Sequence, residues 1–387
     1  MRVLFTSQPE SGHWHPLIPL ARALEAAGYE IAFATTPMGC ARLGAIGVRC
    51  MPVGRDETAE EIAERGARLN EMAAEDRAVV FWSEVFPGSR AARALPDLLT
   101  LVRAWRPSVV VREFLEFAGC IAAEAEGIPH VSVQVAAWRP WLHPLLHPAL
   151  DRLRASVGLD YDPDLAMLYR HLFLVTAPPS FSDAASPLPP TAQSLRPVVF
   201  DRSGDEPMPA WVESLPTDRP TVYATMGTVN NKEVGVLDAI LDGLRDEPFT
   251  LIMTTGRDRE PRAFGPQPEN IHLERYIPQS LLFPHCDLVV NHGGTGTVMA
   301  ALGAGLPMVI VPVAADQPEN ARRCAEIGVA RVVAPAARTP DMIRAAVRAV
   351  LADARYRVNA MRLRDEIDAM PGPGQIVVML ERIAVDR

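Results

Sequence analysis

The chain has 387 residues, of which 48% are hydrophobic and 22% charged, a balance typical of a soluble folded protein with two or three domains. Asp and Glu outnumber Lys and Arg by 47 to 38, for a formal charge of −9, which argues against broad binding to a nucleic-acid backbone. The N-terminus turns polar after Phe5, and the longest apolar stretch, 306–315, is shorter than a membrane span. We therefore expect a cytoplasmic protein with no nucleic-acid partner and no stable membrane insertion.

The first half alternates short runs rich in valine and isoleucine with helical patterns. Strands are expected at 3–5, 31–34, 48–53, 109–111 and 131–135, and helices at 17–24, 58–103 and 118–126. Strands that alternate with helices in this way predict a parallel, doubly wound sheet.

Ten of the 36 prolines lie between Pro178 and Pro220. Such a density of residues with a fixed φ, without helical or strand periodicity, predicts an ordered connector. The alternation then resumes, with strands at 221–224, 250–253, 271–273, 288–291 and 308–311 and helices at 234–244, 298–302, 320–327 and 342–351.

We therefore predict an α/β protein with two doubly wound, Rossmann-like domains that face each other across a cleft. The predicted spans are 1–200 for the first domain, 201–217 for the linker, 218–370 for the second domain and 371–387 for a C-terminal segment that crosses back to the first domain.

Five cysteines (Cys40, Cys50, Cys120, Cys286 and Cys324) lie far apart, and none forms a C-x-x-C pair. An odd number of widely spaced thiols in an expected cytoplasmic protein predicts reduced and mostly buried side chains.

In doubly wound sheets, ligands bind at the carboxyl ends of the strands where the strand order reverses. With a 3-2-1-4 order, this rule selects the loops after Phe5 and Val111 in the first half, which hold Gly12, His13 and Glu113. In the second half it selects Gly227-Thr228 and the segment that begins at Asn291.

His13 is a candidate general base, since an imidazole with a pKa near 6.5 can take a hydroxyl proton at neutral pH. Glu113, at the end of the neighbouring strand, could accept the other ring N–H and set the tautomer. A surface or capping histidine is the alternative.

The segment Asn291-His-Gly-Gly-Thr-Gly-Thr297 ends a strand and opens a helix, an arrangement that receives phosphate on free backbone N–H groups. A nicotinamide-type G-x-G-x-x-G fingerprint is a rival interpretation, but Met299 replaces its third glycine and Asp316 does not end the next strand. A tight turn without a ligand is the other alternative.

Metal sites are weaker candidates. His13 and His15 with His292 lack a completing Cys or acidic cluster, and Pro144 interrupts the helical spacing of His143 and His147. The run Asp160-Tyr-Asp-Pro-Asp164 resembles a magnesium-nucleotide motif, but it lacks a preceding strand and is expected to be a solvated turn. We predict no metal site.

Several of these motifs resemble family 1 glycosyltransferases of the GT-B fold, above all bacterial enzymes that decorate macrolides and aromatic polyketides. The run Gly12-His13-x-His15-Pro16-Leu-Ile-Pro-Leu-Ala is similar to the opening of that family, and Asp287–Thr297 with Gly305-Leu-Pro-Met-Val and Asp316-Gln317-Pro-Glu-Asn320 is similar to its nucleotide-sugar signature. The resemblance continues through Val222–Thr228, Tyr276–Gln279 and Met370–Gly374.

The resemblance implies a role for each matching residue. His13 would deprotonate the acceptor, with Glu113 in the place where the family usually has an aspartate. Asp316 and Gln317 would bond the sugar hydroxyls. The expected donor-binding residues are Gly12, Thr228, Tyr276, Ile277, Gln279, His292, Gly293, Gly294, Thr295, Gly296, Thr297, Asp316 and Gln317. Among them, Tyr276 would stack near the base and Ile277 would read the base edge through its backbone.

Aromatic residues of the first half are expected to bind a hydrophobic acceptor: Trp82, Phe86, Trp138 and Trp141. Ordinary core packing is the alternative for each of them.

The predicted activity is the inverting, metal-independent transfer of a hexose or deoxyhexose from a UDP- or dTDP-sugar to a hydroxyl of a hydrophobic, natural-product-like acceptor, with no further cofactor. Its expected context is antibiotic biosynthesis. A non-catalytic helper protein and a nucleotide-sugar epimerase on the same fold are the alternatives. The sequence leaves open the donor, the acceptor, the number of sugars added and the oligomeric state, a homodimer included.

Overall fold

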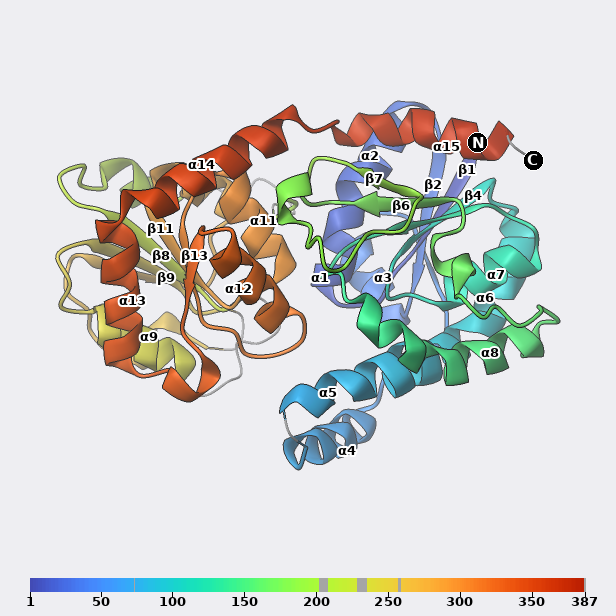
Figure 1. The fold of residues 1–387 in the computed structure, drawn as a ribbon, viewed down its shortest axis with the longest axis horizontal. Coiled ribbons are helices and arrows are strands. Elements are labelled where there is room, and N and C mark those ends of the chain that lie inside the picture. The colour runs from blue at the N-terminus through green and yellow to red at the C-terminus, as the bar shows by residue number, and fades with distance from the viewer. Residues whose placement is uncertain (73, 202–207, 228–234, 257–258, 386–387) are drawn as a thin grey trace. The chain divides into compact units, whose positions relative to one another are not determined.

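The computed structural model describes residues 1–387 except 73, 202–207, 228–234, 257–258 and 386–387. The chain divides into two compact α/β units (Figure 1). Unit 1 consists of Met1–Thr176, Ala184–Leu195 and Pro371–Arg387, and unit 2 consists of Ala177–Asp183 and Arg196–Met370. The predicted two-domain α/β fold is confirmed. That the domains face each other across a cleft stays a prediction.

Unit 1 is built on a parallel sheet with the order β3-β2-β1-β4-β5-β6-β7. Its strands are β1 (Arg2–Thr6), β2 (Glu30–Thr35), β3 (Cys50–Pro52), β4 (Val109–Glu113), β5 (His130–Val133), β6 (Leu172–Val175) and β7 (Ala192–Ser194). Its α-helices are α1 (Ser11–Trp14), α2 (Ile18–Ala26), α3 (Pro37–Gly44), α4 (Ala59–Asn70), α5 (Ala74–Val80), α6 (Ala91–Trp105), α7 (Ala118–Ala125), α8 (His147–Ser156) and α15 (Ile376–Val385).

The central strands of this sheet are apolar on both faces. Residues 3–5 of β1 and 109–111 of β4 are fully buried, as expected where helices cover both sides of a parallel sheet. The observed order contains the predicted 3-2-1-4 arrangement, so the carboxyl ends of β1 and β4 lie side by side.

The helical region predicted at 58–103 is divided in the structure. It begins with a capping box between Thr58 and Glu61, continues through α4 and α5, and passes through a π-helical segment, η2 (Phe81–Arg90), into α6. Pro87 lies within η2, and because proline has no N–H to donate, it favours departure from a regular α-helix.

Unit 2 is also built on a parallel sheet, with the order β10-β9-β8-β11-β12-β13. Its strands are β8 (Thr221–Thr225), β9 (Thr250–Thr254), β10 (Ile271–Glu274), β11 (Leu288–Asn291), β12 (Met308–Ile310) and β13 (Ala330–Val332). Its α-helices are α9 (Val236–Leu244), α10 (Gln279–Leu282), α11 (Thr295–Gly303), α12 (Gln317–Glu326), α13 (Pro340–Ala352) and α14 (Ala354–Ala369). Apolar side chains of β8, β9, β11, α9 and α13 form its core.

The proline-rich stretch 178–220 is not a simple connector. Residues 177–183 belong to unit 2, where Arg323 donates to the carbonyls of Ser180, Phe181 and Ser182 at 2.7–2.8 Å. The next segment returns to unit 1 and adds β7 to its sheet. The chain therefore passes between the units at 176/177, 183/184 and 195/196, whereas the predicted first domain ran without interruption to residue 200.

The C-terminal segment after Met370 belongs to unit 1. Helix α15 lies beside α2 (Figure 1), and the hydroxyl of Tyr29 donates to Glu381 at 2.6 Å. Within the part of the chain that the structure describes, no helix is long and apolar enough to cross a membrane.

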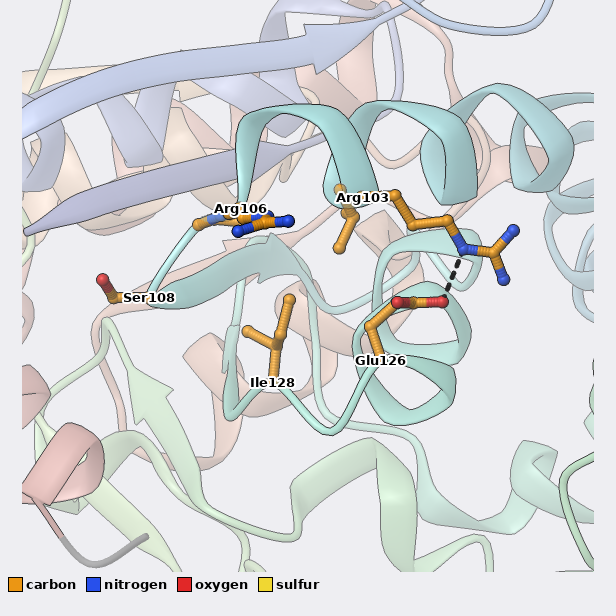
Figure 2. A pocket seen from close by; sticks show the side chains of 7 residues that line it. Arg103, Arg106, Ser108, Glu126 and Ile128 are labelled. Carbon is orange, nitrogen blue, oxygen red and sulfur yellow. Dashed lines mark hydrogen bonds and ion pairs between the residues drawn. The ribbon is translucent and has the colours of Figure 1, made fainter.

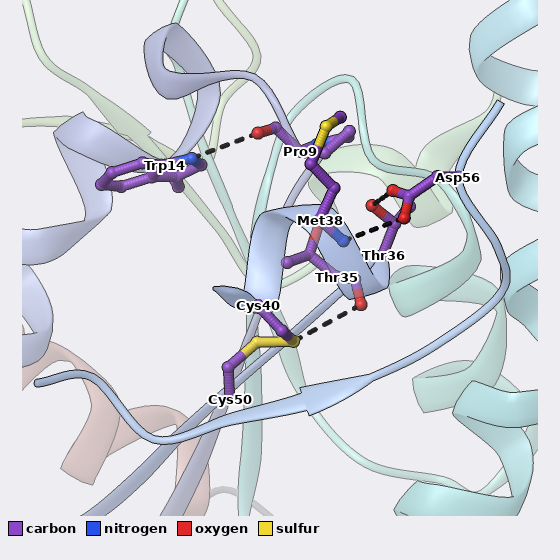
Figure 3. Close-up of a disulfide and its surroundings, with 8 residues drawn as sticks. All are labelled: Pro9, Trp14, Thr35, Thr36, Met38, Cys40, Cys50 and Asp56. Carbon is purple, nitrogen blue, oxygen red and sulfur yellow. Dashed lines mark hydrogen bonds between the residues drawn. A yellow bond between two sulfur atoms is a disulfide. The ribbon is translucent and has the colours of Figure 1, made fainter. Parts of the chain in front are cut away.

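The prediction of reduced cysteines is wrong for Cys40 and Cys50, which form a disulfide (Figure 3). The pairing of β2 with β3 brings α3 and β3 together, so the two α-carbons lie 5.2 Å apart although ten residues separate them in sequence. Cys120, Cys286 and Cys324 are free and buried, and burial raises the pKa of the Cys120 thiol to about 11.

The disulfide should make the protein more stable to unfolding than the same protein without it. Closing a loop of this length restricts the unfolded chain, so Cys40→Ser with Cys50→Ser is expected to lower the free energy of unfolding by about 2–3 kcal/mol. Denaturant titration of the two proteins measures this difference. In denaturant without reductant, alkylation should modify only the three free cysteines; modification of all five would contradict the disulfide.

Candidate functional site

The carboxyl ends of β1 and β4 bring His13 and Glu113 together. His13 lies on α1, one loop after β1, and Glu113 is the last residue of β4. The distance from His13 Nδ1 to Glu113 Oε1 is 3.0 Å. Because the carboxylate can only accept, Nδ1 carries the proton of the neutral ring and Nε2 is the nitrogen that can accept one.

The backbone holds the Glu113 carboxylate in place. Its side chain is 0% exposed, Oε2 accepts the Leu115 N–H at 2.8 Å, and Oε1 also accepts the Gln8 N–H at 3.4 Å. The Glu113 side chain is thus long enough to reach the imidazole, and each of its carboxylate oxygens accepts a hydrogen bond.

The pKa of His13 is raised above its ordinary value. Burial alone would lower it, but the charge of Glu113 and its hydrogen bond outweigh that effect, and Glu10 adds to the rise while Arg90 opposes it. The ring is only 19% exposed.

The predicted acceptor residues divide into three groups. The Phe86 ring lies 5.9 Å from that of His13. Trp82 and Trp138 are packed into an aromatic cluster with Phe114, His143, Tyr169 and Phe173. Trp141 is 52% exposed. The structure therefore places the Phe86 ring beside His13.

The cluster contains a polar pair that the sequence analysis did not identify. His143 Nε2 lies 3.1 Å from the hydroxyl of Tyr169, and burial lowers the pKa of His143 to about 4. The same burial raises the pKa of Tyr169. Both side chains are therefore neutral at physiological pH.

Among the residues that the structure describes, no three His, Cys, Asp or Glu side chains are grouped so that they could hold a metal ion. Asp162, in the middle of the run Asp160–Asp164, accepts hydrogen bonds from the N–H groups of Ala166 and Met167. That run is a turn, as expected, although Asp162 itself is buried.

In unit 2, β8 and β11 are neighbours, and the loops at their carboxyl ends hold Gly227 and His292. The imidazole of His292 packs between two glycine backbones: a β-carbon at either Gly227 or Gly294 would lie 2.5 Å from a ring atom. Gly227 also has a φ of +72°, which favours glycine. Thr228 lies outside the described residues.

His292 is buried, and its Nδ1 has no hydrogen-bond partner among the residues that the structure describes. Burial lowers its pKa to about 4, so the ring is neutral at physiological pH. A buried ring nitrogen without a partner is costly unless a ligand or water satisfies it.

Helix α11 starts at Thr295, three positions after this histidine. Gly294 is its N-cap and supplies no side-chain cap, which leaves first-turn N–H groups without a side-chain acceptor. The preceding residue, Gly293, has a φ of +88° and donates its N–H to Asn291 Oδ1 at 2.7 Å. Gly296 is exposed. The turn from Gly293 to Thr297 thus presents backbone donors and a positive helix end.

Side chains of Asp316, the N-cap of α12, and of Asn320 on α12 fix this turn. Thr295 donates to Asp316 Oδ2 at 2.7 Å, and Asn320 Nδ2 donates to the Gly293 carbonyl at 2.8 Å. The Gln317 oxygen accepts the N–H groups of Val313 and Ala314 at 2.8 and 2.9 Å. Gln317 therefore shapes the loop before α12. Asn320 is a further site residue, which the sequence motif alone does not single out.

The Tyr276–Gln279 segment lies beside the same turn. Gln279 Nε2 donates to Thr297 Oγ1 at 3.3 Å. Ile277 is buried, whereas Tyr276 is 49% exposed and donates its hydroxyl to the Asp201 carbonyl.

A cavity of about 420 Å³ lies elsewhere in unit 1 (Figure 2). Its lining includes Arg106, Ser108 and Ile128, which precede β4 and β5, and an ion pair of 2.7 Å joins Arg103 to Glu126. This is the opposite edge of the sheet from His13 and Glu113, so the cavity is not part of the candidate site.

Comparison with known proteins identifies the family. Residues 22–138 match the N-terminal domain and residues 241–383 the C-terminal domain of the erythromycin biosynthesis protein CIII-like family. The chain is 31% identical to 10-deoxymethynolide desosaminyltransferase of Streptomyces venezuelae, with 99% of this chain and 97% of the relative aligned. It is 30% identical to 4'-demethylrebeccamycin synthase of Lentzea aerocolonigenes, over 98% of this chain and 99% of the relative.

Solved structures agree with this assignment. The glycosyltransferase VinC, in complex with dTDP, superposes with a TM-score of 0.82 at 27% identity and covers 100% of both chains. The spinosyn forosaminyltransferase SpnP superposes with a TM-score of 0.81 at 27% identity, over 100% of this chain and 99% of its own. The chain therefore belongs to the erythromycin biosynthesis protein CIII-like family of bacterial natural-product glycosyltransferases, which have the GT-B fold.

Proposed function

We propose that this glycosyltransferase transfers a hexose or deoxyhexose from a nucleoside-diphosphate sugar to a hydroxyl of a hydrophobic aglycone, with inversion and without a metal ion. The observation that carries the proposal is the 3.0 Å contact between His13 Nδ1 and Glu113 Oε1. It fixes the tautomer of the ring and directs the basic nitrogen, Nε2, away from the carboxylate.

His13 would take the proton of the acceptor hydroxyl while the oxygen attacks the anomeric carbon. Glu113 would stabilise the resulting imidazolium without accepting its proton, as a buried carboxylate partner does in other base dyads. Proton transfer of this kind contributes about 10²- to 10⁴-fold to a rate.

A single displacement is favoured over a covalent glycosyl-enzyme. Glu113, the carboxylate next to His13, is fully buried, and both of its oxygens accept hydrogen bonds, so it cannot serve as the nucleophile that retention requires. Direct attack by the acceptor opposite the leaving diphosphate inverts the anomeric carbon, so an α-linked donor would yield a β-glycoside.

The leaving group would be received by unit 2. The first turn of α11 and the buried His292 present neutral donors and a helix dipole where the diphosphate charge develops. The Nδ1 of His292, which has no partner among the described residues, is a candidate donor to a phosphate oxygen. The roles of Thr228 and Gly12, expected at the same site, stay predictions.

The substrate classes are inferred from the relatives. VinC was solved with dTDP, which favours a dTDP-linked deoxyhexose over a UDP-linked hexose. Relatives act on 10-deoxymethynolide and tylactone, as their names state, and Phe86 beside His13 provides an apolar surface suited to such an aglycone.

Transfer is tested by incubating the enzyme with dTDP- and UDP-sugars and a panel of polyketide aglycones, with detection of nucleoside diphosphate and of glycoside. Both products should appear only when donor and acceptor are present together. His13→Ala should lower kcat about 10²- to 10⁴-fold; an unimpaired variant would remove His13 from the mechanism.

The same assay separates the alternatives. Conversion of the donor alone would indicate an epimerase, and the absence of turnover with every pair, restored by a second protein, would indicate a helper. Activity should persist in EDTA, and complete loss that Mg²⁺ or Mn²⁺ restores would contradict metal independence.

Glu113→Gln should move the acid limb of the kcat–pH profile to lower pH. The carboxylate raises the pKa of His13, and because the base works only when unprotonated, removal of the charge lets it work at lower pH, although the plateau rate falls. The matched control is Glu116→Gln: burial raises the pKa of Glu116, which favours its neutral form, so the acid limb should stay in place. Identical profiles for Glu113→Gln and the wild type would refute the dyad.

Gly294→Ala should weaken nucleoside-diphosphate binding roughly tenfold, because the new β-carbon would displace the His292 ring. Gly303→Ala, on the same helix but with open space at its β-carbon, is the control. Calorimetry with dTDP and UDP measures both variants, and equal affinities would exclude His292 from the phosphate site.

A further inference from the structure

Arg90, the last residue of the π-helical segment η2, binds three side chains around the His13 loop. Its Nη1 donates to Gln8 Oε1 at 3.2 Å and to Glu10 Oε2 at 3.1 Å. Its Nη2 donates to Glu10 Oε1 at 2.7 Å and to Glu57 Oε2 at 2.8 Å. The side chain is only 14% exposed, so these are partly buried, charge-assisted bonds rather than a surface ion pair.

Two of its partners also contact the dyad. The Gln8 N–H donates to Glu113 Oε1, and Gln8 Nε2 donates to the Leu115 carbonyl at 3.1 Å. The Glu10 carbonyl accepts the His13 N–H at 2.9 Å. Arg90 therefore holds both ends of the loop segment that precedes His13.

Arg90 also positions the aromatic ring that covers His13. Its guanidinium carbon lies 5.6 Å from the centre of the Phe86 ring, and that ring lies 5.9 Å from the ring of His13. Phe86 lies four positions before Arg90 on η2, and segments of π-helix occur often at functional sites.

The charges that face His13 come from three elements. Glu113 on β4 and Glu10 in the β1–α1 loop raise its pKa, and Arg90 on η2 lowers it. Glu57, before α4, shares the Arg90 guanidinium and also pairs with Arg65 of α4. Arg90 thus opposes protonation of His13 through its own positive charge. It also offsets the negative charge of Glu10, which favours that protonation.

We propose that Arg90 is a positioning residue for sugar transfer: it holds the Gln8–Glu10 segment and Phe86 around His13 and keeps the imidazole in its basic form. This inference rests on the proposed role of His13 as the base. In this proposal η2, which is remote from His13 in sequence, helps to set the geometry and the charge around the base that activates the acceptor.

The test compares Arg90→Met and Arg90→Lys with Arg93→Met. Arg93 lies one turn further along, on α6, and is paired with Glu61 at 2.6 Å, so it controls for the loss of an ordinary ion pair. The imidazole pKa of His13 is measured by proton NMR, its signal assigned by its absence in His13→Ala, and kcat and KM are measured across the pH range.

Arg90→Met is expected to raise the pKa of His13, because two carboxylates lose their countercharge, and to move the acid limb of kcat to higher pH, opposite to Glu113→Gln. Its kcat should fall about tenfold at neutral pH with the donor KM within about twofold of the wild type. Arg90→Lys should restore the pKa but only part of kcat, since an ammonium cannot reproduce the forked contacts. Arg93→Met should leave the pKa and the acid limb of kcat unchanged.

An unchanged His13 pKa in a folded Arg90→Met protein, or equal effects of Arg90→Met and Arg93→Met, would overturn the proposal. The NMR titration needs no turnover, so it tests the effect of Arg90 on the His13 pKa separately from the role of His13 as the base. If His13→Ala remains fully active while Arg90→Met still shifts the imidazole pKa, the base assignment fails and the electrostatic role of Arg90 stands.

Discussion

The adjacency of β1 and β4 is the constraint on which the candidate site depends. Parallel strands share an edge at which all carboxyl ends meet, and the switch in strand order places two loops there that are about a hundred residues apart in sequence. One loop contributes an imidazole and the other a carboxylate that backbone amides hold in position. Arg90 and Phe86 then enclose this pair from a third element.

Unit 2 uses the same strand order for a different chemistry. There the absence of side chains is decisive, because Gly227 and Gly294 leave just enough space for the His292 ring and the first turn of α11 keeps its N–H groups uncapped. Unit 1 thus holds an imidazole beside a buried carboxylate, whereas unit 2 holds a buried neutral imidazole beside an uncapped helix start. This division matches a reaction in which one substrate loses a proton and the other releases an anion.

The central strand order, the pairing of His13 with Glu113 and the glycine-rich turn could be predicted from the sequence, since alternating patterns and a topological rule sufficed. The short strands β6, β7 and β13 were not predicted. The disulfide could not, because it depends on how α3 packs beside β3. Nor could the Arg90 network, whose partners Gln8 and Glu10 lie 82 and 80 residues away. Motif matching named Gln317 but could not show that its oxygen binds its own loop. Likewise, the aromatic-rich sequence did not reveal that Trp82 and Trp138 both pack against His143. Nor did it reveal that the Phe86 ring lies beside that of His13.

In the proposed mechanism, Glu113 holds His13 as a neutral base with its proton on Nδ1. Nitrogen-15 NMR of the imidazole, recorded above the pKa of His13, reports which nitrogen carries the proton. A protonated Nδ1 and a bare Nε2 are expected, with a weaker preference in Glu113→Gln, whose amide oxygen is a poorer acceptor than the carboxylate. A ring protonated on Nε2 in the wild-type protein would contradict it, because that nitrogen could not then accept the acceptor's proton.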